Sequence, residues 1–63
     1  LSYKDKFVKY KNSFISTKAN IHNSSIIGNN CVIGKGVKIG KNCIIKDNVV
    51  IKNSILEENI IVN

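Results

Sequence analysis

The chain has 63 residues, which allows one small domain, and domains of that size bury little apolar surface and are only marginally stable. Its formal net charge of +6 at pH 7 would ordinarily suggest nucleic acid or an anionic membrane as a partner. However, all of its basic residues are Lys, whereas bidentate contacts to phosphate or guanine favour Arg. The lysines follow a general bias towards Lys, Asn and Ile, as in proteins from A+T-rich genomes. We therefore expect neither nucleic acid nor a membrane as a partner.

Targeting signals are not apparent in the sequence. It has no apolar run of the roughly 18 residues that a membrane-spanning helix needs. Its first twelve residues lack the continuous apolar core of a secretory signal. We therefore expect a cytoplasmic protein, and the missing initiator methionine suggests a piece cut from a longer chain.

The first twelve residues differ in pattern from the rest of the chain. Tyr3, Phe7, Tyr10 and Phe14 are spaced like one face of a helix. The lysines off that face are Lys4, Lys6, Lys9 and Lys11. Such a stripe can be a basic amphipathic anchor for a membrane or partner. We favour the other interpretation, in which residues 1–12 form a linker or a short helical cap over the open end of the domain that follows.

From residue 13 onwards the sequence repeats every six residues. An isoleucine occupies the same place in each repeat, at Ile15, Ile21, Ile27, Ile33, Ile39, Ile45 and Ile51. The residue two places earlier is always small or β-branched, at Ser13, Ala19, Ser25, Cys31, Val37, Cys43 and Val49. Two side chains at i and i−2 lie on one face of a strand, so each repeat predicts a short strand that points both residues inward.

The third place after the isoleucine predicts a corner. This place holds Asn or Gly in most repeats, and these residues tolerate positive φ best. Short strands joined by regular corners form a triangular coil of about eighteen residues per turn, stacked as a parallel β-helix. Residues 13–63 then make about three coils. Ile15, Ile33 and Ile51 should form one stack, Ile27 and Ile45 a second, and Asn12, Asn30 and Asn48 an outer column whose amides can bond along the stack.

The six-residue repeat slips by one position after Ile51. The next expected inward position is Glu57, which is implausible in an apolar core. If one residue is lost, Leu56 and Val62 become the inward residues instead. The segment "IKNSIL" is therefore predicted to be a tightened corner.

The Gly-Lys run in the repeats is not a phosphate-binding loop. A P-loop needs GxxxxGK[ST], whose backbone N–H groups surround the phosphates. Here five residues separate Gly28 from Gly34, and Gly36 follows Lys35. Corner glycines explain the pattern better.

The remaining reactive side chains are also weak candidates for catalysis or metal binding. His22 could be the general base of a hexapeptide acyltransferase, but no second catalytic group accompanies it, and a solvated corner histidine is the better interpretation. Cys31 and Cys43 lie two repeats apart, so they should face different sides, remain reduced and not pair. One His and two Cys at no metal-site spacing do not indicate zinc or a three-histidine carbonic anhydrase site.

The run "SSIIGNNCVIGKGVKIGKNCIIKDNVVIKNSIL", residues 24–56, resembles the C-terminal domain of nucleotide-sugar pyrophosphorylases, in particular mannose-1-phosphate guanylyltransferases. The resemblance implies that the β-helix is left-handed, as in many sugar-handling transferases. The same pattern of repeats occurs in the epsilon and gamma subunits of the exchange factor that recycles a GTP-binding translation initiation factor of eukaryotes. A fragment of a hexapeptide acyltransferase is a third possibility.

The resemblance also implies a division of labour within the parent protein. In that family the chemistry belongs to a Rossmann-like domain with a nucleotide loop and metal-binding aspartates, where Mg²⁺ is expected. No position of this chain matches those motifs, so we assign it no catalytic, cofactor-binding or metal-binding residues and expect no catalysis from these 63 residues. The family's β-helix serves in assembly, in holding the catalytic domain and sometimes in allosteric regulation. Its expected partners are its own catalytic domain, a homo- or hetero-oligomer, or both.

Overall fold

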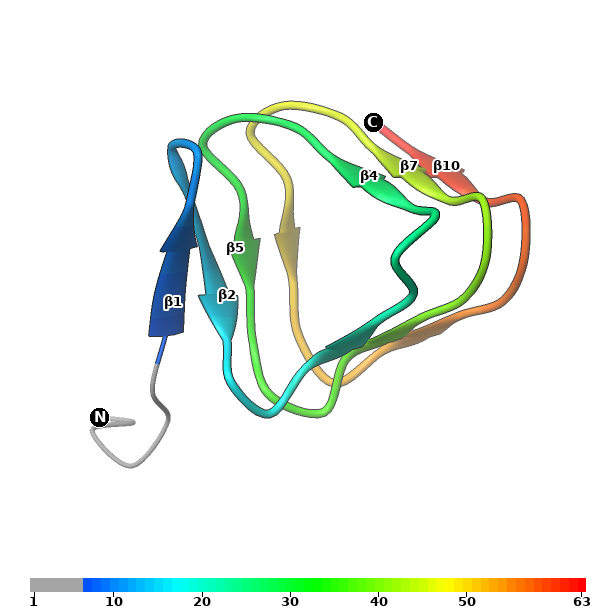
Figure 1. Cartoon of the computed structure of the whole chain (residues 1–63), viewed down its shortest axis with the longest axis horizontal. Helices are drawn as coiled ribbons and strands as arrows, with labels where there is room; N and C mark the ends of the chain where they lie inside the picture. Colours follow the sequence, from blue (N-terminus) through cyan, green and yellow to red (C-terminus); the bar gives the residue numbers. More distant parts are fainter. Residues whose placement is uncertain (1–6) are drawn as a thin grey trace.

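The computed structural model describes residues 7–63, which contain ten β-strands and no helix (Figure 1). The strands are β1 (Phe7–Tyr10), β2 (Ser13–Ser16), β3 (Asn20–Ile21), β4 (Ile26–Ile27), β5 (Val32–Ile33), β6 (Lys38–Ile39), β7 (Ile44–Ile45), β8 (Val50–Ile51), β9 (Ile55–Leu56) and β10 (Ile61–Val62). No helix in this part of the chain is long and apolar enough to cross a membrane.

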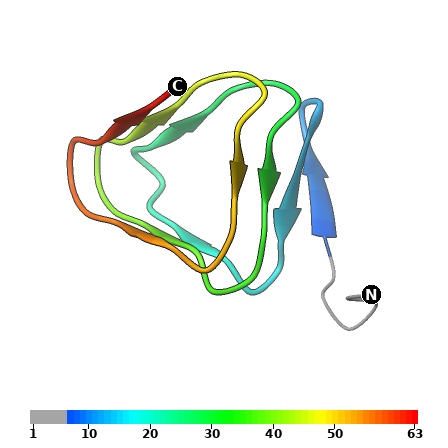
Figure 2. The ribbon, with the colours of Figure 1, turned by 180° about the vertical axis from the view of Figure 1, so that it is seen from behind.

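The strands wind into a triangular coil with three flat faces, as Figures 1 and 2 show from opposite sides. Face A contains β2, β5 and β8, with β1 added at its edge; face B contains β3, β6 and β9; face C contains β4, β7 and β10. Neighbouring coil strands within each face run parallel. Each face takes one strand from each of three successive turns, which confirms the predicted all-β parallel β-helix of about three coils.

The inward isoleucines stack as predicted. Ile33 pairs with Ile15 on one side and Ile51 on the other, and Ile27 pairs with Ile45. The buried core consists of Ile27, Cys31, Ile33, Val37, Ile39, Cys43, Ile45, Val49 and Ile51. All of these residues belong to the two inward positions of the repeat, because alternate side chains of a strand point to opposite faces.

The small inward residue beside each corner also links successive coils by hydrogen bonds. The Ser13 hydroxyl donates to the Gly28 carbonyl at 2.7 Å and accepts the Cys31 N–H at 2.9 Å. Ser25 bridges the Gly40 carbonyl and the Cys43 N–H in the same way. In the next coil, cysteines occupy the positions of these two serines. The Cys31 Sγ atom donates to the Lys46 carbonyl at 3.0 Å, and the Cys43 Sγ atom donates to the Glu57 carbonyl at 2.9 Å.

The corners use positive φ only from the second coil onwards. The corner residues with positive φ are Asn30, Gly36, Asn42, Asn48, Asn53 and Asn59. Lys18 and Ser24 hold the same place in the first coil but do not have positive φ. Those two corners are instead closed by turn hydrogen bonds, from Ala19 N–H to the Ser16 carbonyl and from Ser25 N–H to the His22 carbonyl, both at 3.0 Å. In the asparagine column, the Asn30 N–H donates to the Asn12 carbonyl at 3.2 Å, which is a backbone contact.

Two repeat glycines have a different role from the one that the sequence suggested. Among residues 7–63, only Gly36 combines the absence of a side chain with a positive φ, of 74°. At Gly28 an added Cβ would lie 3.0 Å from the backbone N of Asp47, and at Gly40 it would lie 3.1 Å from the Glu57 carbonyl oxygen. Glycine at positions 28 and 40 is therefore favoured by the close approach of the next coil's backbone, not by a need for positive φ at the corner.

The predicted slip after Ile51 is confirmed by the pairing. Leu56 pairs with Ile39, and Val62 pairs with Ile45, so these partners stand seventeen residues apart instead of eighteen. The corner after β8 is the one that is shorter by a residue. Asn53 in this corner has a φ of 45°, and its N–H still donates to the Lys35 carbonyl at 3.3 Å.

The helical interpretation of the first residues is wrong where the structure describes them. Residues 7–10 form β1, which turns back at Lys11, with a φ of 56°, and pairs antiparallel with β2. Phe7 and Phe14 thus lie on strands, and Tyr3 lies outside the described residues. The spacing misled because four residues are too few to establish a helical period. The free edge of β2 instead gives residues 7–10 a strand partner.

Candidate functional site

The Gly-Lys run forms a corner that bonds to the next coil. The Gly34 N–H donates to the Ile51 carbonyl at 2.9 Å, and the Lys35 carbonyl accepts the Asn53 N–H. Lys35 itself is exposed. A phosphate-binding loop needs several free N–H groups that converge on one point, and here the Gly34 N–H is used for stacking on the next coil.

The two cysteines lie inside the coil and are not joined to each other. Both are free and fully buried, and each thiol faces a carbonyl of the following coil. Among residues 7–63, no group of three or more His, Cys, Asp or Glu side chains could hold a metal ion.

His22 takes part in a corner contact that the sequence did not reveal. Its Nδ1 atom accepts the Ser24 backbone N–H at 3.1 Å and lies 2.8 Å from the Ser24 hydroxyl. The Ser24 Oγ atom in turn accepts the Asn42 N–H from the next coil at 2.9 Å. Because a backbone N–H can only donate, Nδ1 must be an acceptor, and the neutral ring carries its proton on Nε2.

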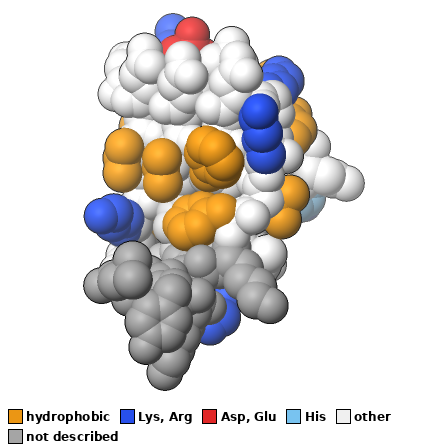
Figure 3. Space-filling model, turned by 90° about the vertical axis from the view of Figure 1, so that its left-hand side faces the viewer, with side chains coloured by type: hydrophobic (Ala, Val, Ile, Leu, Met, Phe, Trp, Pro, Cys, Tyr) orange, Lys and Arg blue, Asp and Glu red, His pale blue; other side chains and the backbone are white. Residues whose placement is uncertain are grey.

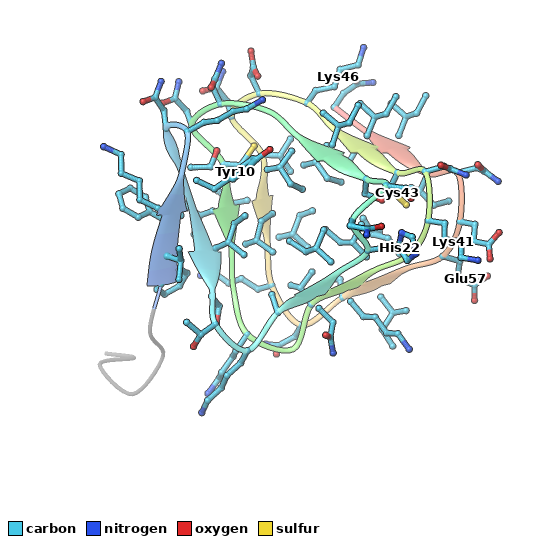
Figure 4. The ribbon with its side chains drawn as sticks, viewed as in Figure 1. Tyr10, His22, Lys41, Cys43, Lys46 and Glu57 are labelled. Carbon is cyan, nitrogen blue, oxygen red and sulfur yellow. The ribbon has the colours of Figure 1, made fainter. Side chains whose placement is uncertain are left out.

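A groove lies on the outside of face B beside this corner. Its volume is about 370 Å³, and its lining includes Asn20, His22, Lys38, Gly40, Lys41 and Glu58. A neighbouring hollow shares Lys38, Gly40 and Glu58 and continues towards Ile55. In Figure 4, His22 and Lys41 lie at the same corner of the coil, with Glu57 beside them. Basic, acidic and imidazole side chains of the described residues thus line a common hollow.

The outer surfaces of faces A and C are apolar. On face C, Ile26, Ile44 and Ile61 stack in register and are 56%, 38% and 59% exposed. On face A, Phe14, Val32 and Val50 stack in the same way. Figure 3 shows hydrophobic side chains gathered on the side of the molecule where β1 lies. Single exposed apolar residues are ordinary, but columns in register form contiguous patches that favour protein contacts.

The first coil has an open end. A hollow of about 370 Å³ is lined there by inward residues of the first turn, including Ile15, Ala19, Ile21 and Ile27. Tyr10 of β1 reaches over it (Figure 4), and the Lys11 ammonium lies 5.5 Å from the centre of its ring. This end of the core is only partly covered by the described residues.

The comparisons with known proteins agree with the repeat and the fold. Residues 9–63 match the family described as the GMPPB C-terminal domain. No curated protein and no solved structure gives a significant match. Because the match spans all three coils and β2 to β10 in full, this chain belongs to that family, the C-terminal domains of nucleotide-sugar pyrophosphorylases of the mannose-1-phosphate guanylyltransferase type.

Proposed function

We propose that residues 13–63 are the assembly and regulatory module of a nucleotide-sugar pyrophosphorylase. Such an enzyme joins a nucleoside triphosphate and a sugar 1-phosphate to make a nucleotide sugar and pyrophosphate. The reaction and its Mg²⁺ would belong to a catalytic domain of the same protein. The family match supports this proposal.

The observation that carries the assembly role is the isoleucine column of face C. Ile26, Ile44 and Ile61 are held in register by parallel pairing and are exposed on the outside of this face. Burying such a column against a partner would contribute a favourable free energy on the order of 1 kcal/mol or more per side chain. The partner that we propose is the protein's own catalytic domain or a second subunit, homo- or hetero-oligomeric.

We also propose a cytoplasmic location and expect no nucleic-acid or membrane partner. The two cysteines support the location because they are buried and reduced and act as hydrogen-bond donors inside the coil. The composition supports the second expectation, since all ten basic residues are Lys and none is Arg.

The assembly role is tested by Ile44→Lys in the whole protein. A buried ammonium in an apolar contact costs several kcal/mol, so we expect the interface to weaken by about tenfold or more. Analytical ultracentrifugation would detect lost subunits, and limited proteolysis would detect a released catalytic domain. The matched control is Ile55→Lys, because Ile55 holds the equivalent outward place on face B, is 70% exposed and neighbours Lys38.

Two results would count against the proposal. If Ile44→Lys left both the assembled mass and the proteolytic pattern unchanged, face C would not be the contact surface. The second result is an absence of the reaction, with no nucleotide sugar and no pyrophosphate formed from a nucleoside triphosphate and a sugar 1-phosphate. If the whole protein instead promoted nucleotide exchange or acyl transfer, it would be an exchange-factor subunit or an acyltransferase.

A further inference from the structure

The groove on face B exists because of Gly40. The outward positions of one column are His22 in the first coil, Gly40 in the second and Glu57 in the third, since the His22 N–H bonds to the Ile39 carbonyl and the Gly40 N–H to the Leu56 carbonyl, both at 2.9 Å. The middle position has no side chain, so the surface is hollowed between a histidine and an acidic segment. An added Cβ would also meet the Glu57 backbone at 3.1 Å. The hollow is thus built into the stacking of the coils.

One side of the groove offers hydrogen-bond donors. His22 lines it, and the bonds that fill Nδ1 leave Nε2–H as the free donor of the neutral ring. Lys38 on β6 and Lys41 in the following corner add two ammonium groups. A phosphate group, with its several acceptor oxygens and its negative charge, is the ligand that three such donors suit best.

The other side of the groove offers an acceptor. Glu58 lines both the groove and its continuation towards Ile55. A carboxylate repels an isolated phosphate, but it accepts hydrogen bonds from hydroxyl groups. The volume of about 370 Å³ lies within the range of small-molecule sites. We propose that this groove binds the phosphate monoester of a sugar, with the phosphate at Lys38, Lys41 and His22 and the hydroxyl groups towards Glu58.

This site does not depend on the assembly role proposed for face C, because it lies on a different face. The test therefore measures the chemical reactivity of the lysine side chains in the groove. In the whole protein, lysine side chains are acylated with a limiting reagent, and the modification of each lysine is measured by mass spectrometry with and without a hexose phosphate. A ligand bound at a catalytic domain elsewhere does not alter the reactivity of these lysines directly.

We expect selective protection at the groove. At a hexose phosphate concentration several times the dissociation constant, modification of Lys38 and Lys41 should fall by about fivefold, because only the unoccupied fraction reacts. Lys35 and Lys52 are the matched controls, since both are exposed lysines of corners outside the groove, and they should not change. Neutral hexose should protect none of these lysines. In Lys38→Gln the protection of Lys41 should weaken.

Three outcomes would overturn the proposal. Unchanged modification of Lys38 and Lys41 would show that the groove does not bind the ligand. Equal protection of Lys35 and Lys52 would show a general effect of anions on a basic chain. Protection by inorganic phosphate as strong as by hexose phosphate would remove the role assigned to Glu58, since an acceptor for hydroxyl groups adds nothing to the binding of free phosphate.

Discussion

The small residue beside each corner has a hydrogen-bonding role as well as a packing role. A chain that coils every eighteen residues leaves carbonyl and N–H groups at its corners that the strand ladders do not reach. Ser13 satisfies one of each, from Gly28 and Cys31, and Ser25 does the same one corner further on. A serine hydroxyl is suited to this position because it both donates and accepts within a small volume.

Ser13→Ala should therefore destabilise the fold although it removes only one atom. The Ser13 side chain is fully buried, and its loss leaves the Gly28 carbonyl and the Cys31 N–H without their partner. We expect the free energy of unfolding to fall by about 1–3 kcal/mol, measured by urea denaturation of the whole protein.

The control for this prediction is Ser54→Ala. Its hydroxyl donates only to the nearby Lys52 carbonyl at 2.8 Å, in an exposed corner, so the change should stay within about 0.5 kcal/mol. Equal effects of the two substitutions would show that the buried bridge between coils adds nothing beyond a local bond.

At the scale of the element, most strands of the coil have two residues, and most corners between them have four. Such strands are too short to be stable singly, so each depends on its register with the coils above and below. A shift of one residue within a strand would turn every following inward side chain outward. A corner has no such constraint, which explains why the chain can lose one residue between β8 and β9 and keep Leu56 and Val62 inward.

Insertion of one glycine should therefore have opposite consequences at two nearby places. Between Asn53 and Ser54 it would give this corner the same length as the corner that contains Lys35 and Gly36, so we expect a change within about 1 kcal/mol. Between Ile44 and Ile45 of β7 it would break the pairing with β4 and β10, so we expect a loss of more than about 4 kcal/mol. Thermal unfolding followed by circular dichroism would measure both, and similar losses would contradict the importance of register.

At the scale of the whole molecule, the described coil is not closed at either end. Tyr10 covers only part of the hollow around Ile15 and Ile21. At the other end, β8, β9 and β10 are the last strands of their faces within residues 7–63, so one edge of each has no partner strand there. Open edges of this kind invite pairing with another chain.

We accordingly expect these 63 residues, taken from the rest of their protein, to be marginally stable or to self-associate. Burying the open ends in a self-association would raise the midpoint of thermal unfolding as the protein concentration increases. Sedimentation velocity combined with thermal scans over a range of concentrations would measure this. A monomer with a high midpoint that does not change with concentration would contradict it.

The sequence by itself determined the fold class, the inward columns and the slip after Ile51. These features follow from a periodicity that is local, because a strand alternates its side chains every two residues and a corner recurs every six. The family resemblance rested on the same repeats. The prediction of no catalytic, cofactor-binding or metal-binding residues remains a prediction.

Only the tertiary structure decided how residues far apart in the sequence meet. β1 is a strand because the free edge of β2 offers it hydrogen bonds, which a spacing of aromatic residues does not encode. Glycine is favoured at positions 28 and 40 because the next coil passes close to them. The contact of His22 with Ser24 and Asn42, and the groove that Gly40 opens beside it, likewise depend on one coil lying directly on another. Stacking is set by the packing of the whole coil, and no single repeat contains it.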